Sequence, residues 1–217
     1  MDTEILQRIA ELTETGKINK KLNKGEVGVD ELTKQALDEG IEPATVLDAL
    51  VKGMSIIGEK FAQGKAFVPQ MLISARAMSA GMAHLKPFFS SGEVKRKGTF
   101  VIGTVYGDLH DIGKNLVAMM VEGSGWEVID LGVDVKPEKF IDAVTAHPGS
   151  IIGLSALLTT TMGNMESIVK AVREKVPDAR VIIGGAPVSQ SFADKIGANG
   201  YSSNPQGAVE LLNRLVA

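Results

Sequence analysis

The spacing of apolar residues in the first 90 positions predicts helices. Ile5, Ile9 and Leu12 recur at helical intervals, and similar amphipathic stretches follow at about 29–38, 43–61 and 67–85. Gly40 is typical of a helix C-terminus, and Pro43 is typical of the first turn of the next helix. Helical segments that follow one another with no strand pattern between them predict a four-helix bundle.

A polar stretch then separates two patterns. Ser90–Gly98 combines small residues with a run of charges, a composition typical of an interdomain linker. We therefore predict a helical domain over residues 1–90, a linker over 91–98 and a second domain over 99–217.

In the second domain, short β-branched runs alternate with helical patterns. The expected strands are 99–105, 127–131, 150–155, 180–183 and a weak one near 200–201; the expected helices are 112–123, 137–146, 163–176, 188–196 and 205–216. Parallel strands need crossover helices, so this alternation predicts a doubly wound, five-stranded parallel sheet covered on both faces, a flavodoxin- or Rossmann-like α/β fold. With the strand order 2-1-3-4-5, ligands bind beyond the carboxyl ends of strands 1 and 3, where the winding reverses.

Composition narrows the range of functions. The 217 residues carry a net charge of -3, which supplies no basic surface for nucleic acid. The absence of cysteine excludes disulfides, thiol nucleophiles and Cys-ligated metal sites. No leader pattern opens the chain, and no apolar run approaches the roughly 20 residues of a membrane span. We expect a cytoplasmic protein with neither nucleic acid nor membrane as a partner.

Several familiar motifs are missing from the second domain. Gly103, Gly107 and Gly113 follow the first strand at the wrong spacing for a dinucleotide site, and no P-loop occurs. The chain also lacks a Ser/His/Asp nucleophile elbow and paired carboxylates, which disfavours a hydrolase.

The unusual residues gather instead at the predicted switch point of the sheet. They are Asp108, His110 and Gly113 after the first strand, Ser155, Leu157, Thr159, Thr160 and Thr161 after the third, and Gly184 and Gly185 after the fourth. The two glycines are small enough to let a bulky ligand lie against the backbone. Asp108 is placed to accept the second ring N–H of His110, and the hydroxyl of Thr161 is placed to extend this relay.

His110 itself has three possible roles: metal ligand, general base, or a loop residue that satisfies a local hydrogen bond. His84 and His147 are expected at the surface or in caps, so His110 lacks the co-ligands of a zinc site. If His110 binds a metal, the remaining ligands must come from a cofactor that brings its own ring. A corrin or a haem meets that condition.

In combination, Asp108-x-His110-x-x-Gly113, Ser155-x-Leu157 and Gly184-Gly185 resemble the cobalamin-binding signature of methionine synthase and of corrinoid proteins of methyltransferase systems. The stretches 64–71 and 74–78 are similar to the helical cap domain that precedes the cobalamin domain in those proteins. The resemblance therefore covers nearly the whole chain.

The resemblance implies roles for individual residues. His110 would replace the benzimidazole of cobalamin as the lower axial cobalt ligand, Asp108 would bond its other nitrogen, and Thr161 would stand where methionine synthase has a serine. The remaining cofactor contacts would come from Asp111, Ile112 and Gly113 beside His110, from Ser155, Leu157, Thr159, Gly184 and Gly185 along the nucleotide tail, and from Phe67 and Met71 over the upper face of the corrin.

The resemblance also implies a function. The chain would be a methyl-carrying corrinoid subunit, not an enzyme by itself, that serves a substrate-specific methyltransferase and an acceptor methyltransferase using a tetrahydrofolate, a tetrahydropterin or a thiol. A reductive activation protein would be a further partner. The alternatives are a cobalamin-dependent sensor or regulatory module, which usually adds a DNA-binding module for which no residues remain, and a plain flavodoxin-like interaction module. The sequence does not distinguish methanol, methylamines, betaines and aryl methyl ethers as methyl donors.

Overall fold

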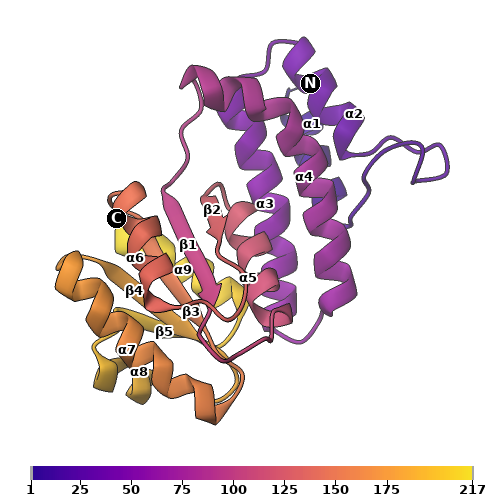
Figure 1. Cartoon of the computed structure of the whole chain (residues 1–217). Coiled ribbons are helices and arrows are strands. Elements are labelled where there is room, and N and C mark those ends of the chain that lie inside the picture. Colours follow the sequence, from indigo (N-terminus) through magenta and orange to yellow (C-terminus); the bar gives the residue numbers. More distant parts are fainter. Residues whose placement is uncertain (1, 217) are drawn as a thin grey trace. The chain divides into compact units, whose positions relative to one another are not determined.

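The computed structural model describes residues 2–216, which divide into two compact units (Figure 1). The first unit runs to Arg96 and takes in Gly123–Gly125. The second comprises Lys97–Glu122 and the residues from Trp126 onward.

Among the described residues, the first unit contains four helices, as the apolar spacing predicts. They are α1 (Asp2–Glu14), α2 (Val29–Asp38), α3 (Pro43–Ala62) and α4 (Val68–Ser91). Helix α3 packs against α1 and α4, and α2 packs against α4, around buried Ile9, Leu50, Met54 and Leu85. No helix within residues 2–216, in either unit, is long and apolar enough to cross a membrane.

Helix α4 extends past Leu85, the last apolar position of its sequence pattern, to the predicted end of the helical domain. It continues through Pro87 and ends at Ser91. An interior proline removes a backbone donor and disfavours the helix, yet α4 continues to Gly92, which adopts the left-handed conformation (φ 80°) at the C-cap. The chain from Gly92 to Gly98 then has no helix or strand before the sheet begins.

Within the described residues, the second unit forms one five-stranded sheet in which every pair of neighbours is parallel. The strands are β1 (Thr99–Thr104), β2 (Glu127–Asp130), β3 (Ile151–Ser155), β4 (Arg180–Gly184) and β5 (Gly200–Ser202). Their order, β2-β1-β3-β4-β5, confirms the predicted doubly wound fold and puts the reversal of winding between β1 and β3.

Helices cover both faces of the sheet. The crossover helices are α5 (Ile112–Glu122), α6 (Pro137–Ala146), α7 (Thr159–Lys175) and α8 (Gln190–Ile196), and α9 (Pro205–Val216) follows the last strand. Val101, Ile152 and Ile183 join Phe140 of α6 and Met165 of α7 in one core cluster. The strand residues that alternate with them are also buried, and α5 and α9, which pack against each other and against the sheet, cover that second face.

The start of α7 corrects the sequence prediction. The helix begins at Thr159 rather than at 163, so Thr161 lies in its first turn and not in a loop. Leu158, at the N-cap position, provides no capping side chain. The backbone N–H groups of Leu157 and Leu158 donate instead to the carboxylate of Asp108, which is distant in sequence. A cap supplied by another segment leaves no local sequence signal.

Close packing inside the sheet predicts that alanine changes the free energy of unfolding in opposite directions at two glycines. A Cβ added to Gly153 in β3 would lie 2.3 Å from the buried ring of Phe100, whereas one added to Gly163 in α7 would meet nothing within 4 Å. We expect Gly153→Ala to lower the free energy of unfolding by about 1–3 kcal/mol. Gly163→Ala, the control, should raise it by roughly 0.5–1 kcal/mol, because alanine favours the helix. Urea unfolding monitored by circular dichroism measures both, and equal stabilities would contradict the packing described for β3.

Candidate functional site

A buried carboxylate at the carboxyl end of β1 holds the site together. Oδ1 of Asp108 accepts hydrogen bonds from the backbone N–H of His110 (3.1 Å) and from its ring Nδ1 (2.7 Å). Oδ2 accepts from the N–H groups of Leu157 (2.8 Å) and Leu158 (3.3 Å) and from Oγ1 of Thr161 (2.7 Å). Asp108 thus joins the loop after β1 to the first turn of α7, at the switch point of the sheet.

These contacts determine the charge of Asp108. Its side chain is completely buried, and burial by itself raises the pKa of the carboxyl group. The hydrogen bonds from Thr161, Leu157 and His110 outweigh that effect and hold the pKa of Asp108 well below its usual range. The carboxylate is therefore ionised at neutral pH, and its position at the N-terminus of α7 is favourable for a negative charge.

The ionised Asp108 fixes the tautomer of His110. Because a carboxylate only accepts hydrogen bonds, Nδ1 of His110 must carry the proton that it donates. In the neutral ring, Nε2 then has a free lone pair and no hydrogen-bond partner among the described residues. The side chain is 51% exposed, so Nε2 can be reached by a ligand. The arrangement is typical of an imidazole that binds a metal with a carboxylate behind it.

The backbone of this loop is also fixed. Oγ1 of Thr104, at the buried end of β1, donates to the carbonyl oxygen of His110 (2.8 Å). The orientation of the imidazole is therefore set from its side chain and from its backbone. Sequence reasoning missed Thr104, whose only signal was a hydroxyl at the end of an apolar strand.

Exposed apolar side chains surround His110. Leu109 in the loop and Ile112, the first residue of α5, flank it and are 72% and 71% exposed. Leu157 and Leu158, whose N–H groups bind Asp108, are exposed as well. Apolar side chains gathered around one reachable polar atom fit a broad ligand with apolar edges. Ile112 and Leu157 were predicted as site residues; Leu109 and Leu158 were missed, although both interrupt otherwise polar motifs.

The predicted site glycines lie in different backbone environments. Ser155 and Gly184 are partners in the register of β3 and β4. Gly185 has φ +128°, and an added Cβ would lie 1.8 Å from the carbonyl oxygen of Ala156. The backbone of the chain itself therefore requires glycine at Gly185, which is a different reason from the predicted room for a ligand. Gly113, by contrast, faces open space in the first turn of α5.

The other predicted contacts lie in several places. Asp111 directly precedes α5 and is exposed, while Thr159 is exposed as the first residue of α7. Phe67 and Met71 belong to the helical unit, where Phe67 is 67% exposed at the N-cap of α4 and Met71 is buried. Contact of Phe67 and Met71 with a cofactor stays a prediction.

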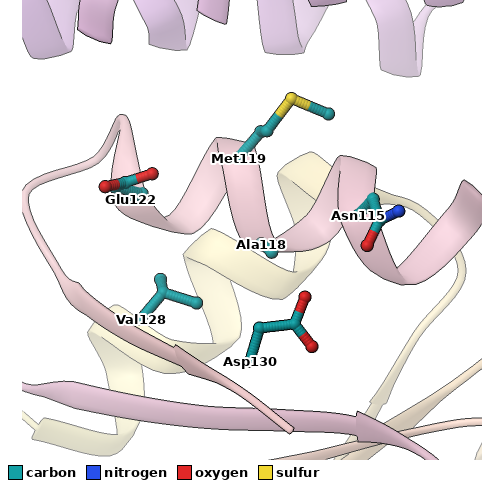
Figure 2. Close-up of a pocket in the computed structure, with 6 residues that line it drawn as sticks. All are labelled: Asn115, Ala118, Met119, Glu122, Val128 and Asp130. Carbon is teal, nitrogen blue, oxygen red and sulfur yellow. The ribbon is translucent and has the colours of Figure 1, made fainter. Parts of the chain in front are cut away.

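A separate hollow of about 310 Å³ lies between α5 and the edge strand β2. Figure 2 shows Val128 and Asp130 of β2 facing the helix; the other lining residues are Asn115, Ala118, Met119 and Glu122. Asp130 is paired with the buried Lys114, so its carboxylate takes part in an ion pair that joins α5 to β2. None of the lining residues was predicted as a site residue, and the hollow contains no metal-binding imidazole.

His110 is not part of a cluster of metal-binding side chains in the described part of the chain. Within residues 2–216, no group of three or more His, Asp or Glu side chains could hold a metal ion. A metal at Nε2 must therefore bring most of its ligands with it, as the metal of a planar macrocycle does. The reachable Nε2 and the apolar side chains around it fit such a group.

Comparison with known proteins agrees with this geometry. Two families, each described as a B12 binding domain, match residues 98–209 and 25–86. A corrinoid protein of Desulfitobacterium hafniense (strain Y51) is 42% identical over 87% of this chain and 90% of its own length. The dimethylamine corrinoid protein of Methanosarcina barkeri is 40% identical over 82% and 85% of the two chains.

Solved structures extend the similarity to the fold. A cobalamin-binding protein from Desulfitobacterium hafniense DCB-2 matches with a TM-score of 0.77 and 31% identity, over 100% of this chain and 99% of its own. The methanol:cobalamin methyltransferase complex MtaBC from Methanosarcina barkeri matches with a TM-score of 0.78 and 30% identity, over 98% of this chain and 80% of the matched chain.

The lowered pKa of Asp108 predicts a pH-dependent effect of Asp108→Asn. The substitution should lower the free energy of unfolding at pH 7 by about 2–4 kcal/mol, because one amide oxygen cannot replace two charged acceptors. Since the folded-state pKa is depressed, the contribution of Asp108 is full above its unfolded pKa and is lost as the pH falls. The difference between wild type and variant should therefore shrink by roughly 1 kcal/mol per pH unit below about pH 4.

Urea unfolding between neutral and acidic pH measures this difference. Asp142→Asn is the matched control, because Asp142 is exposed on α6 and makes no hydrogen bond through its side chain in the described part of the chain. If the difference in free energy of unfolding between the wild type and Asp108→Asn stays constant as the pH falls below about 4, the lowered pKa of Asp108 is contradicted.

Proposed function

The chain belongs to the corrinoid proteins with B12 binding domains, and on this basis we propose that it carries a methyl group on the cobalt of a bound corrinoid between two methyltransferases. One partner would be specific for the methyl donor and the other for the acceptor. The matching relatives are named as dimethylamine and trimethylamine corrinoid proteins, and one matching structure is a methanol:cobalamin methyltransferase complex. Because these names differ in the donor, we assign the choice of donor to the partner methyltransferase.

The observation that carries the proposal is the hydrogen bond between Nδ1 of His110 and Asp108, which leaves Nε2 reachable. When bound, the corrinoid would supply a cobalt centre that can take up and release a methyl group. His110 would hold the cobalt through Nε2, in place of the benzimidazole of the cofactor. Asp108 would keep the ring in the tautomer that can do so.

Asp108 and Thr161 would also determine whether a proton is held by His110 or by Asp108. With no metal at Nε2, that nitrogen would be free to accept a proton, which would make the ring an imidazolium cation. The ionised Asp108, 2.7 Å from Nδ1, would stabilise this imidazolium. The donors to Oδ2, Thr161 among them, keep the negative charge on Asp108, so the proton would stay on His110.

The remaining predicted residues would bind the rest of the cofactor. Leu109, Ile112 and Leu157 would pack against the corrin and exclude water from Nε2. Along the carboxyl edges of β3 and β4, the residues proposed for the nucleotide tail are Ser155, Leu157, Thr159, Gly184 and Gly185. Asp111 and Gly113 would lie beside the lower face, and Phe67 and Met71 of the helical unit would cover the upper face.

A carrier of this kind depends on other proteins. We propose that the chain is not an enzyme by itself and that its acceptor methyltransferase uses a tetrahydrofolate, a tetrahydropterin or a thiol. A reductive activation protein would restore the cofactor after oxidation. We also propose that the helical cap moves away when a partner needs the methyl group.

Replacing His110 with Ala tests the ligand assignment. We expect the variant to fold, because the imidazole is half exposed, and to bind cobalamin without the absorption spectrum of a His-coordinated cobalt. The spectrum should instead be that of a water- or benzimidazole-coordinated cofactor. Absorption spectroscopy of the reconstituted protein, with circular dichroism to check folding, measures both expectations.

His147→Ala is the matched control, because that histidine follows α6 and makes no side-chain hydrogen bond in the described residues. It should leave the spectrum as in the wild type. A His110→Ala spectrum identical to the wild type would contradict the axial assignment, and a wild-type protein that stays colourless after incubation with cobalamin would contradict the whole proposal.

A further inference from the structure

Backbone hydrogen bonds fasten the loop before His110 to the loop between β2 and α6. Val135 N–H donates to the carbonyl of Thr104 (2.9 Å), and Asp134 N–H donates to the carbonyl of Asp108 (3.0 Å). Oδ1 of Asp134 in turn accepts from the N–H of Gly107 (2.7 Å). The residues that extend from the two loops are therefore held in fixed positions.

The conformation of Asp134 shows that this junction is strongly determined. Its φ of 55° lies in the left-handed region, which is unfavourable for a residue with a side chain. Aspartate tolerates that region better than most residues because its short carboxylate can bond nearby backbone groups. Here the carboxylate binds Gly107, so the strained residue is also the one that joins the loops.

Tyr106 and Lys136 project from this junction. Tyr106 is 49% exposed, although its backbone is tethered through Asn164, whose Nδ2 donates to the Tyr106 carbonyl (2.7 Å). Lys136 is exposed at the N-cap of α6, with Nζ 5.7 Å from the centre of the Tyr106 ring. An exposed aromatic ring on a rigid backbone, beside a cation, has the properties of a recognition surface.

The pair lies close to the relay of His110. A Cβ added to Gly107, the neighbour of Tyr106, would be 3.6 Å from Cγ2 of Thr161. Asn164, which holds Tyr106, lies on the same helix α7 as Thr161. Tyr106 is thus next to the residues that hold the imidazole, and its side chain, like that of Leu109, is exposed.

We propose that Tyr106 and Lys136 form a subsite for the edge of the corrin that carries amide side chains. The ammonium of Lys136 and the hydroxyl of Tyr106 would donate to the carbonyl oxygens of those amides, and the Tyr106 ring would pack against the apolar rim between them. This inference rests on the proposed function, because it assumes that Nε2 of His110 binds the cobalt at the centre of the corrin. It adds residues that neither the motif nor the relay contains.

An acidic surface of a partner protein is the competing occupant of the same pair. The corrin is favoured because Tyr106 belongs to the loop that carries Asp108 and His110, and because the junction at Asp134 fixes Lys136 relative to that loop. A docking surface for a partner does not need to be fixed to the relay in this way.

Binding titrations of the apoprotein test the subsite. Cobalamin and cobinamide, which lacks the nucleotide but keeps the corrin amides, are each titrated into wild type, Tyr106→Ala and Lys136→Ala, with absorbance as the readout. We expect each variant to bind both compounds about 3- to 10-fold more weakly, the range of one or two lost hydrogen bonds. The His-coordinated spectrum at saturation should be retained, and Tyr106→Phe should lose less affinity than Tyr106→Ala.

Lys170→Ala is the matched control, because it removes the same charge from an exposed position on α7 whose side chain makes no hydrogen bond or ion pair in the described residues. Its affinity should equal that of the wild type. Thermal unfolding verifies that each variant is folded. If Lys136→Ala is not folded, Lys136→Met, which keeps the stem of the side chain, replaces it; if Tyr106→Ala is not folded, Tyr106→Phe replaces it.

Three results would overturn the subsite. One is an affinity within about twofold of the wild type for both compounds in both variants. Another is a loss with cobalamin but none with cobinamide, which would assign the pair to the nucleotide. The third is unchanged affinity with slower methyl transfer to a partner methyltransferase, which would assign it to protein docking. A wild type that binds without the His-coordinated spectrum would instead contradict the proposed function, and the subsite with it.

Discussion

The buried carboxylate of Asp108 is the interaction on which the site depends. It accepts from the backbone N–H groups of Leu157 and Leu158 directly before α7, fixes the tautomer and orientation of His110, and binds the hydroxyl of Thr161. A buried charge is unfavourable unless its lone pairs are satisfied, and here both oxygens have several donors. The loop after β1 and the start of α7 therefore cannot move independently. Anything that displaces α7 also displaces the imidazole, so the packing of the sheet and the chemistry of the site are linked through one side chain.

Much of this could be predicted from the sequence, because the relevant signals are local. Alternating β-branched runs and helical patterns predict the parallel sheet, and the order of the strands puts the switch point beside His110. The spacing of Asp108 and His110 within one loop, and the hydroxyl of Thr161 after the third strand, were sufficient to predict their hydrogen bonds, which the structure contains. Their roles toward a cofactor remain proposals. The missing cysteines and the single candidate imidazole pointed to a metal that brings its own ring.

What the sequence did not reveal depends on segments that meet only in the fold. The start of α7 at Thr159 was missed because the N–H groups before it bind Asp108, and the close approach of Gly185 to Ala156 was not foreseen because the two residues lie far apart in the sequence. The exposure of Leu109 was also hidden, since an apolar residue in a loop is as easily buried as exposed. The position of Tyr106 could not be foreseen either, since it depends on which loops are hydrogen-bonded to each other.

The central claim is that Asp108 holds His110 as the lower ligand of a bound corrinoid. The most direct test is the electron paramagnetic resonance spectrum of the cobalt(II) form, prepared from protein whose histidines carry the heavy nitrogen isotope and from cofactor with ordinary nitrogen. The account predicts that the splitting from the axial nitrogen changes from triplets to doublets on labelling, and that the doublets are lost in His110→Ala. Triplets that persist in the labelled wild-type protein would show that the benzimidazole is still the ligand, and would contradict the account.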